Sequence, residues 1–285
     1  MVHVPPPPAP WDDVAGKKVI VYQEQGLGDT IQFIRFVPYL LEKGAEITIA
    51  TLPPLLRLLT LSFPDVTVRK LTDFHREEGY SYAVPIPDLT FVAGVKSESD
   101  IPARIPYLRA DEHDVRRFSA MLPARRPRIG LVWAGERRMQ AEFVAADKRR
   151  STTLAEMGAA LTPVDATLIS LQFGAPRQEL TAWQGQPLFD PMGEIRDMAD
   201  TLALMESLDL IISVDTSPVH LAGAIGRPVW LVSRWDACWR WGDSGDTSPW
   251  YPSIRIFRAQ ERGFAPVLKE VGAALQQWVR DWKAD

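Results

Sequence analysis

The chain has 285 residues, of which 46% are hydrophobic, and its formal net charge is −4. This length suits two domains of ordinary size, while the negative balance excludes proteins that bind nucleic acid or an anionic membrane through their overall charge. The only cysteine, Cys238, excludes an internal disulfide and a zinc site built on cysteines. Because a single free thiol is typical of a reducing compartment, we expect a cytoplasmic protein, and a peripheral place at the inner membrane face is compatible with this.

The N-terminus contains Pro5 to Pro8 in a row. This composition is typical of an extended polyproline segment rather than of a core. We therefore assign residues 1–15 to a proline-rich arm that resembles the end of a linker, which other modules could precede. The chain opens on no signal-peptide pattern and contains no stretch of about 18 apolar residues, so we expect neither secretion nor a membrane span.

In the first half of the chain, apolar runs of strand length alternate with stretches of helical periodicity. The expected strands are residues 17–22, 45–50, 66–69 and 80–85, and the expected helices are residues 30–41 and 53–62. Such alternation predicts a parallel sheet covered by helices. From about residue 93 to residue 127 the periodicity fades, and charges and prolines dominate. We place the interdomain region there.

The second half repeats the same alternation. Its expected strands are residues 128–133, residues 167–172, a strand that ends at residue 215, a strand that begins at residue 229, and residues 254–258. Its expected helices are residues 154–161, 195–207 and 266–282 and a helix that begins at residue 217. We therefore expect two open α/β lobes of similar size, with a boundary between residues 115 and 116. The N-terminal lobe covers residues 16–115, the C-terminal lobe covers residues 116–264, and a final helix over residues 265–285 packs back on the N-terminal lobe.

Polar groups gather where the strand near residue 215 leads into a helix. Asp215 ends the strand, Thr216 adds a hydroxyl, and Ser217 is a favourable N-cap with Pro218 at the first helical position. Free backbone N–H groups and the helix dipole attract phosphate, and open parallel sheets bind ligands beyond the carboxyl ends of their strands. Asp215 and His220 could each be ordinary structural residues, but their shared position favours an anion-binding site.

A glycine-containing turn follows the first strand. It reads Gln25-Gly26-Leu27-Gly28-Asp29-Thr30. The dinucleotide fingerprint needs a third glycine where Ile31 stands, and a following Gly-Lys-Ser/Thr is missing too. Two interpretations of Asp29 stay open. It is either an N-cap that only stabilises the next helix, or a carboxylate in an interlobe cleft that accepts the proton of a sugar hydroxyl as a general base.

A long, basic connection follows the strand at residues 128–133. Loops of such length inside a compact lobe tend to be functional or disordered. Ser151 and Thr152 can cap the helix that follows, and the next strand end directs Gln172 toward the same edge of the sheet. Basic runs are usually a solvated surface, but the place beside a helix start favours a grip on phosphate. The basic residues are Arg137, Arg138, Lys148, Arg149 and Arg150.

The remaining histidines and the tryptophans point to no further site. His3, His75 and His113 are scattered without the spacing of metal ligands, so we expect no bound metal. Five of the ten tryptophans lie between residues 230 and 250. Their rings could stack on sugars or nucleobases, yet packing is the commoner role of tryptophan, and we expect it here.

Four of these segments match one family in order and spacing: Gly28-Asp29-Thr30, Lys148-Arg149-Arg150-Ser151, Ser170-Leu171-Gln172 and Val214 to His220. Together they resemble the family 9 glycosyltransferases, the heptosyltransferase group, over most of the chain. Trp239-Arg240-Trp241 and the segment from Ser248 to Pro252 are similar to the bacterial branch that is fused behind tetratricopeptide repeats. Where Ser217-Pro218 stand, the family commonly has glycine or alanine, so the resemblance leaves the sugar open.

The resemblance implies the GT-B architecture, in which two Rossmann-like open parallel-sheet lobes face each other across a cleft. It also implies metal-independent, inverting transfer from a nucleotide-diphosphate sugar on the C-terminal lobe, with no cofactor. By position, Asp29 corresponds to the general base, within an acceptor-side loop that we assign to Gln25, Gly26, Gly28 and Thr30. The expected donor residues are Lys148 with Ser151 or Thr152 for the pyrophosphate, Asp215, Thr216 and His220 for phosphates and sugar, and Gln172 and Ser217 beside them.

The leading hypothesis is an inverting glycosyltransferase that moves a hexosyl or heptosyl group from a nucleotide sugar to a glycan, a lipid-linked or a protein acceptor. Because the chain carries no repeat array, a separate repeat protein could supply the acceptor. An alternative is a non-catalytic nucleotide-sugar-binding scaffold module, and a third is an epimerase or hydrolase on the same fold. The nucleobase and the sugar stay open.

Overall fold

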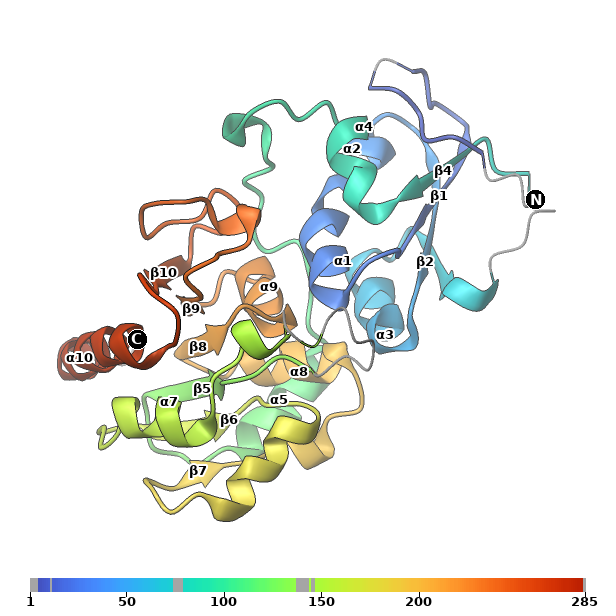
Figure 1. Cartoon of the computed structure of the whole chain (residues 1–285). Helices are drawn as coiled ribbons and strands as arrows, with labels where there is room; N and C mark the ends of the chain where they lie inside the picture. Colours follow the sequence, from blue (N-terminus) through green and yellow to red (C-terminus); the bar gives the residue numbers. More distant parts are fainter. Residues whose placement is uncertain (1–4, 11, 74–78, 137–143, 145–146, 284–285) are drawn as a thin grey trace.

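The computed structural model describes residues 5–10, 12–73, 79–136, 144 and 147–283, which form two lobes (Figure 1). The N-terminal lobe holds a four-stranded sheet and the C-terminal lobe a six-stranded one, each with helices against it. This confirms the α/β fold with two sheets. Arg137, Arg138, His3 and His75, which entered the sequence predictions, lie outside the described residues. Within these ranges, no helix combines the length and the apolar content that a membrane span requires.

The sheet of the N-terminal lobe is parallel, with the strand order β3-β2-β1-β4. Its strands are β1 (Lys18–Tyr22), β2 (Glu46–Thr51), β3 (Thr67–Lys70) and β4 (Tyr82–Pro85), and its helices are α1 (Leu27–Phe33), α2 (Val37–Glu42), α3 (Pro53–Ser62) and α4 (Leu89–Val92). We expected one helix over residues 30–41. The structure starts it earlier and divides it by the 3-10 turn η1 (Ile34–Phe36), because Pro38 has no N–H to continue the α-helical hydrogen bonds.

The sheet of the C-terminal lobe is also parallel, in the order β10-β9-β8-β5-β6-β7. Its strands are β5 (Arg128–Val132), β6 (Thr167–Ser170), β7 (Leu188–Phe189), β8 (Leu210–Val214), β9 (Val229–Ser233) and β10 (Ile254–Arg258). The α-helices of this half are α5 (Glu112–Met121), α7 (Leu154–Leu161), α8 (Met198–Met205), α9 (Ser217–Ala224) and α10 (Ala265–Asp281). Short 3-10 turns include η4 (Ile86–Asp88), η6 (Ala175–Ala182), η7 (Met192–Glu194) and η8 (Trp239–Trp241).

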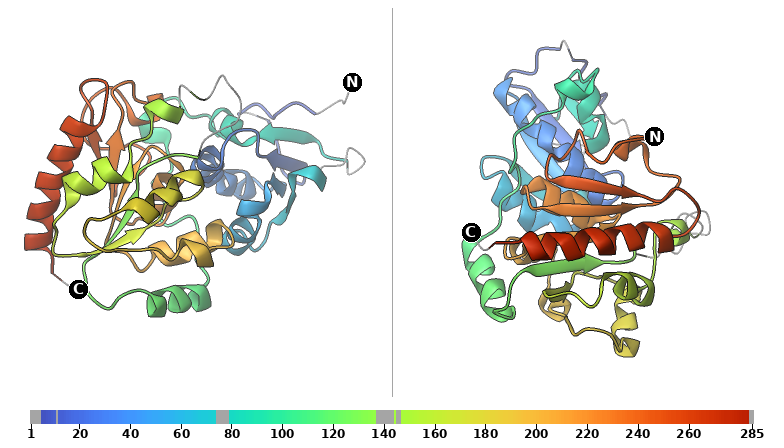
Figure 2. Two further views of the ribbon diagram at one scale, coloured as in Figure 1. Left: turned by 60° about the horizontal axis from the view of Figure 1, so that its bottom comes forward. Right: turned by 90° about the vertical axis from the view of Figure 1, so that its left-hand side faces the viewer.

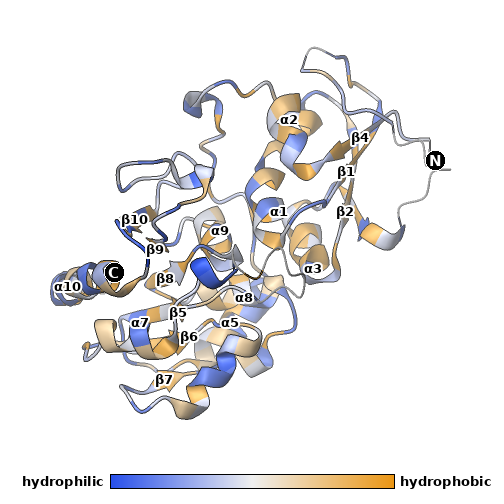
Figure 3. Cartoon of the chain, in the orientation of Figure 1, coloured by the Kyte–Doolittle hydropathy of each residue, from blue (hydrophilic) through white to orange (hydrophobic). Residues whose placement is uncertain are grey.

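Three central strands of the C-terminal lobe are buried along their whole length. Every residue of β5, β8 and β9 is buried, because helices cover both faces of a parallel sheet and leave no side for solvent. Figure 3 shows hydrophobic residues along the strands of both sheets. The carboxyl ends of β5, β8 and β9 therefore emerge from a rigid, apolar support, which fixes the positions of the residues that follow them.

One apolar core runs through both lobes. It joins Ile31 and Phe36 beside the first sheet to Leu202 and Leu221 on α8 and α9 of the second lobe, all of them buried. In this core α1 packs directly against α9. The two helices that begin at the predicted site loops are thus held together by continuous burial rather than by a linker alone.

The final helix, α10, packs on the C-terminal lobe, so the expected return to the N-terminal lobe is wrong. Its apolar face buries Val267, Leu268 and Val271 in the second core cluster, against α7 and the strands β9 and β10. Gly272 allows this contact, because a Cβ there would lie 2.1 Å from the Ala160 carbonyl oxygen. Figure 2 shows α10 on the far side of the C-terminal lobe from the N-terminal sheet.

One segment near the lobe boundary differs from the sequence expectation. Helix α5 lies where periodicity fades. Asp111 caps it by accepting hydrogen bonds from the N–H groups of His113 and Asp114, and the helix packs on α8 of the C-terminal lobe.

Within the described part of the proline-rich arm, the Pro6 carbonyl accepts a hydrogen bond from Ala83 N–H at 3.4 Å. The arm therefore runs along β4.

Candidate functional site

A cavity of about 470 Å³ lies between the lobes, at the carboxyl ends of β1, β5, β8 and β9. This is the edge at which open parallel sheets bind ligands. Its wall from the N-terminal lobe consists of Gln23, Gln25, Gly26, Leu27, Gly28, Asp29 and Leu52. Its wall from the C-terminal lobe consists of Gly135, Glu136, Arg150, Asp215, Thr216, Ser217, His220, Arg234, Cys238 and Arg240. We call this cavity the cleft.

The cleft brings together two sets of predicted site residues from the two lobes. Gln25, Gly26, Gly28 and Asp29 face Asp215, Thr216, Ser217 and His220. The local starts of the helices differ slightly from expectation. Thr216, rather than Ser217, is the N-cap of α9, and Asp29 is the third residue of α1 rather than its N-cap. Ser217 and Pro218 are therefore the first two helical residues.

Asp29 is held at both carboxylate oxygens. Its Oδ2 accepts a hydrogen bond from the backbone N–H of Gly26 at 3.0 Å, which satisfies one free donor at the start of α1. Its Oδ1 forms an ion pair with Nη2 of Arg240, which comes from η8 of the other lobe. Arg240 is itself fixed, because its Nε donates to Gln32 Oε1 at 2.9 Å and its Nη1 to Cys238 Sγ at 3.1 Å. The carboxylate is thus aimed across the cleft.

Gly28 is required by the approach of the two lobes. A Cβ at this position would lie 2.8 Å from Cδ2 of His220 and 3.6 Å from Cα of Ser217. A side chain would therefore push α1 away from α9. The glycine at this position therefore allows the close approach of the opposite helix.

His220 is buried, with 5% of its surface exposed. Its Nδ1 lies 3.0 Å from the Tyr251 hydroxyl, and its ring stacks on Trp241 at a centroid distance of 5.3 Å. Burial, followed by the positive charges of Arg240 and Arg35, lowers the pKa of His220 to about 3. The imidazole is therefore neutral at physiological pH and cannot attract phosphate as a cation.

Asp215 is surrounded by positive charge. Burial raises the pKa of its carboxyl above the usual value, although the Trp241 side chain and three nearby guanidinium groups oppose this. Those groups belong to Arg234, Arg150 and Arg240, and all three line the cleft. Arg150, Arg234 and Arg240 also pair with Asp147, Asp236 and Asp29. Their guanidinium groups bring several N–H donors to this end of the cleft, which suits an anionic ligand.

The basic loop contributes Arg150 to the cleft, whereas the sequence favoured its neighbour Lys148 for the donor site. Arg150 lines the cleft and pairs with Asp147 at 2.9 Å. A Cβ at Gly135 would lie 2.7 Å from Arg150 Nε, so this glycine makes room for the guanidinium. Lys148, by contrast, is exposed and is not among the residues that line the cleft.

Two other residues predicted for the donor site, Ser151 and Thr152, and Thr30 of the acceptor-side loop form hydrogen bonds to neighbouring protein groups. Ser151 Oγ accepts from Gly135 N–H at 3.2 Å and donates to the Asp147 carbonyl at 2.8 Å, which ties the loop together. The Thr152 hydroxyl bonds the Glu156 carboxylate, and neither residue caps α7, because Thr153 does so. From the acceptor-side loop, the Thr30 hydroxyl is turned back to the Gly26 carbonyl at 3.3 Å.

Gln172 fixes the end of β5. Its side-chain oxygen accepts from the N–H groups of Trp133 and Ala134, at 3.0 and 2.9 Å, and its amide nitrogen donates to the carbonyls of Ala134 and Phe173. It lines a second cavity of about 270 Å³ that shares Leu27, Gly135, Glu136, Thr216 and Ser217 with the cleft. The other walls of this adjoining cavity are largely apolar and include Pro54, Val132, Leu171, Phe173, Met198 and Pro218.

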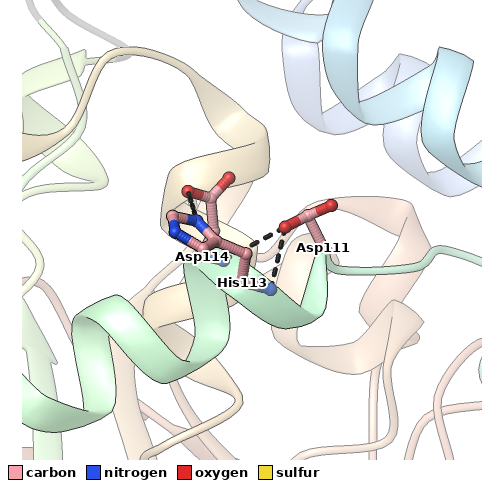
Figure 4. Close-up of side chains that lie close together, drawn as sticks. All are labelled: Asp111, His113 and Asp114. Carbon is pink, nitrogen blue, oxygen red and sulfur yellow. Dashed lines mark hydrogen bonds and ion pairs between the residues drawn. The ribbon is translucent and has the colours of Figure 1, made fainter.

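One group of described residues has the spacing of metal ligands, and it lies outside the cleft. Figure 4 shows Asp111, His113 and Asp114 at the start of α5. Asp111 is occupied as the helix cap, Asp114 pairs with Arg57 at 2.5 Å, and the His113 side chain is 80% exposed. These contacts give the group a structural role, and we infer no metal site from it.

The sequence reasoning missed the two guanidinium groups of Arg234 and Arg240. Both lie among tryptophans, whose number led us to interpret the segment as packing. Trp241 and Trp250 are indeed buried, whereas Trp235 and Trp239 are exposed. An arginine directly after the buried strand β9, at the same sheet edge as Asp215, was the available signal for Arg234.

Comparisons of sequence find one distant relative and no family. No family profile matches the chain. Protein FlbA of Caulobacter vibrioides is 25% identical over 291 residues, and the match covers 93% of this chain and 47% of FlbA. The chain therefore spans about half the length of the curated relative that it matches.

Solved structures share the fold. The family 9 glycosyl transferase from Veillonella parvula has a TM-score of 0.61 at 14% identity, covering 95% of this chain and 99% of its own. The iron-containing dodecameric heptosyltransferase TibC, from enterotoxigenic E. coli, has a TM-score of 0.60 at 13% identity in its complex with ADP-D-β-D-heptose, covering 94% and 77%. The ADP-heptose heptosyltransferase II of E. coli has a TM-score of 0.53 at 16% identity, covering 91% and 99%.

These likenesses show that the chain has the fold of the heptosyltransferases, and the structures that it resembles are glycosyltransferases. They confirm the GT-B architecture that the sequence resemblance implied. The association with tetratricopeptide repeats stays a prediction, because none of the comparisons bears on it.

Proposed function

We propose that the protein is a glycosyltransferase that takes a sugar from a nucleotide-diphosphate sugar. One observation carries this proposal: a carboxylate of one lobe, Asp29, and three arginines of the other lobe line one cavity at the strand ends. Catalysis of glycosyl transfer needs these two features, a base for the acceptor hydroxyl and a stabilised leaving group. The shared fold with glycosyltransferases supports the same conclusion.

The donor diphosphate fits the corner of the cleft beside Asp215, where the arginines lie. Arg150 and Arg234 supply guanidinium donors from two loops, and the start of α9 supplies the backbone N–H of Ser217. This arrangement replaces Lys148, which the resemblance favoured, with its neighbour Arg150. The adjoining cavity would hold the flat, partly apolar nucleobase between its apolar side chains and Ser217.

In the proposed reaction, Asp29 accepts the proton of the acceptor hydroxyl while the oxygen forms a bond to the anomeric carbon. The bond from that carbon to the donor phosphate breaks, and its electron pair leaves with the nucleoside diphosphate. Arginine side chains and N–H groups stabilise the charge that develops there. Because Asp29 and the diphosphate corner lie on opposite walls, attack comes from the face opposite the leaving group, and the anomeric configuration inverts.

Arg240 has a positioning role in this scheme. It binds Asp29 and also lies close enough to lower the pKa of Asp215, so it spans the cleft between the two walls. It would hold the carboxylate toward the acceptor and lie beside the negative charge of the donor. The acceptor is a glycan, a lipid-linked molecule or a protein. A separate repeat protein could supply it.

The test is a screen of ADP, UDP, GDP and dTDP for a rise in melting temperature, followed by assays with the corresponding sugars. A ligand at 100 times its Kd stabilises the native state by about 2.7 kcal/mol. We expect one nucleotide to stand out, and its sugar to be transferred or slowly hydrolysed. A melting temperature that none of the four changes would overturn the proposal. Binding without consumption of any donor would favour the scaffold module, and a rearranged sugar would favour an epimerase.

A further inference from the structure

A buried cation lies behind the histidine of the cleft. Arg35 is 3% exposed, and its described partners include no carboxylate. Its guanidinium donates to the carbonyls of Trp250 at 2.6 Å and Gln32 at 2.9 Å and to the Tyr107 hydroxyl at 3.1 Å. It also lies over the rings of Tyr107 and Tyr251, at 4.7 and 4.6 Å. Because arginine has only donors, each of these oxygens must accept.

This requirement fixes the direction of the hydrogen bonds that follow. Since Tyr107 accepts from Arg35, its own hydrogen goes to the Ile31 carbonyl at 2.9 Å. In the 3.4 Å contact between the two tyrosines, Tyr107 is on the donor side, so its oxygen is not an acceptor for Tyr251. Nδ1 of His220, at 3.0 Å, is the acceptor that the described contacts offer to the Tyr251 hydrogen. Tyr251 therefore donates to Nδ1.

We infer that the chain Arg35, Tyr107 and Tyr251 fixes His220 as the Nε2–H tautomer, so that the ring presents a neutral hydrogen-bond donor to the cleft. A neutral imidazole whose Nδ1 accepts a hydrogen bond must carry its proton on Nε2. Burial and the charges of Arg240 and Arg35 keep the pKa of the ring near 3, which preserves this state across the physiological range. Tyr251 and Arg35 are positioning residues in this account.

The Nε2–H group donates its hydrogen bond to an oxygen of the nucleotide sugar, so this part of the inference rests on the proposed function. His220 lines the cleft beside Asp215 and Ser217, and its ring edge, with Cδ2 and Nε2, is turned toward Gly28. A neutral donor at this point binds a phosphate or sugar oxygen without adding charge. It would also release the product more readily than a cation would, because hydrogen bonds from ionised donors are roughly twice as strong.

The tautomer is measured directly by long-range ¹H–¹⁵N spectra of the protein labelled at its histidine ring nitrogens. The chain has four histidines, and a His220→Leu variant assigns the signal. We expect Nε2 protonated and Nδ1 unprotonated, without titration between pH 5 and pH 8. Tyr251→Phe should remove the preference and give a mixture of tautomers. A proton on Nδ1 in the wild type, or a ring that titrates in this range, overturns the inference even where Tyr251→Phe fails to fold.

A binding measurement tests whether Nε2–H contacts the ligand, independently of the test of the tautomer. With the nucleotide that the screen identifies, His220→Gln, whose amide N–H can replace Nε2–H, should bind almost as the wild type does. His220→Leu should weaken binding about three- to tenfold, the cost of one neutral hydrogen bond. Equal affinity of both variants contradicts the role of Nε2–H in binding. If no nucleotide binds the wild type, the proposed function fails, while the spectra still decide the tautomer.

Discussion

Two of the polar contacts between the lobes differ in their place in the fold. Arg57 of α3 reaches across to the C-terminal half, where it pairs with Asp197 at 2.7 Å and with Asp114 and Asp200 at 2.5 Å. Arg196 adds bonds to Asp200, whose side chain is fully buried. Burial raises the pKa of Asp200, but the hydrogen bonds from Arg196 and Arg57 outweigh it and lower the pKa overall. We call this group the ion cluster.

The second contact, the cleft, also pairs its charges, because Arg150, Arg234 and Arg240 contact Asp147, Asp236 and Asp29. It differs from the ion cluster in its place in the fold. The cleft lies at the carboxyl ends of β1, β5, β8 and β9 and beside the start of α9, where open parallel sheets bind ligands. The cavity of about 640 Å³ beside the ion cluster is lined from α3, α5 and the segment around η7, with no strand end. The difference teaches that charges across a lobe boundary indicate a ligand site through their place at the strand ends, and not through their number.

Removing a carboxylate from the ion cluster should have the largest effect on stability. Asp200→Asn leaves Arg57 and Arg196 without their buried partner, and breaking such a pair costs about 3–5 kcal/mol of unfolding free energy. Chemical denaturation measures it, with the exposed Asp65→Asn as the matched control. We expect the nucleotide affinity of the folded variant to stay unchanged. A loss of affinity as large as the loss of stability would mean that the two contacts act as one.

Acid should weaken the same cluster. Burial raises the pKa of Asp197 and of Asp200. The hydrogen bond from Arg57 outweighs it at Asp197, and those from Arg196 and Arg57 outweigh it at Asp200, so both folded-state pKa values lie below the unfolded value of about 4. Their contribution is therefore complete above about pH 4 and is lost as the pH falls through the folded values. Melting temperatures measured from pH 6 to pH 3 should decrease toward the acid end. Asp200→Asn should show a smaller decrease, and an equal one would assign the acid sensitivity elsewhere.

Filling the contact between α1 and α9 should disturb the cleft. In Gly28→Ala the added methyl group meets the His220 ring at 2.8 Å, so the helices must separate, at a cost of about 1–3 kcal/mol. We expect weaker nucleotide binding as well, because His220 and Ser217 shift together. Gly193→Ala is the control, since its Cβ would come no closer than 3.4 Å to the end of Arg177. A Gly28→Ala variant with full stability and full affinity would contradict the contact.

The smallest expected effect is on nucleotide affinity, and it distinguishes Arg150 and Arg234 from Lys148. Arg150→Gln and Arg234→Gln should each weaken nucleoside-diphosphate binding about tenfold, because hydrogen bonds to charged groups contribute about 1.5–3 kcal/mol. Lys148→Gln should leave the affinity within about twofold, because this exposed side chain does not line the cleft. Isothermal titration measures all three. The reverse order would return the diphosphate contact to Lys148, as the family resemblance implied.

The strands were predictable because they lie under helices. The apolar runs at β1, β5, β8 and β9 are buried by their own lobe, so composition alone reveals them. Helix α5 was not predictable, because Phe118 is the only fully apolar side chain it buries, and its other buried residue, Asp114, belongs to the ion cluster. The position of α10 was missed for a different reason. The apolar face of a helix indicates that other residues cover this face, but it does not indicate which lobe supplies them.

The same distinction explains which site residues were found. Asp29, Asp215 and His220 follow or begin elements whose ends the sequence marks, so their place at the sheet edge could be inferred. Arg150 and Lys148 are two residues apart in one basic run, and only the orientation of each side chain decides which enters the cleft. That orientation depends on Gly135, in a segment distant in sequence.

The most direct test compares donor binding and transfer in Asp29→Asn. This variant keeps the size and most hydrogen bonds of the side chain but cannot take the acceptor proton. We predict a donor Kd within about threefold of the wild type and a rate of transfer lower by about 10²- to 10⁴-fold, the usual contribution of a general base. Glu24→Gln, an exposed neighbour of the same loop, should keep both. Unimpaired transfer by Asp29→Asn would contradict the account, because the carboxylate would then have no part in the chemistry.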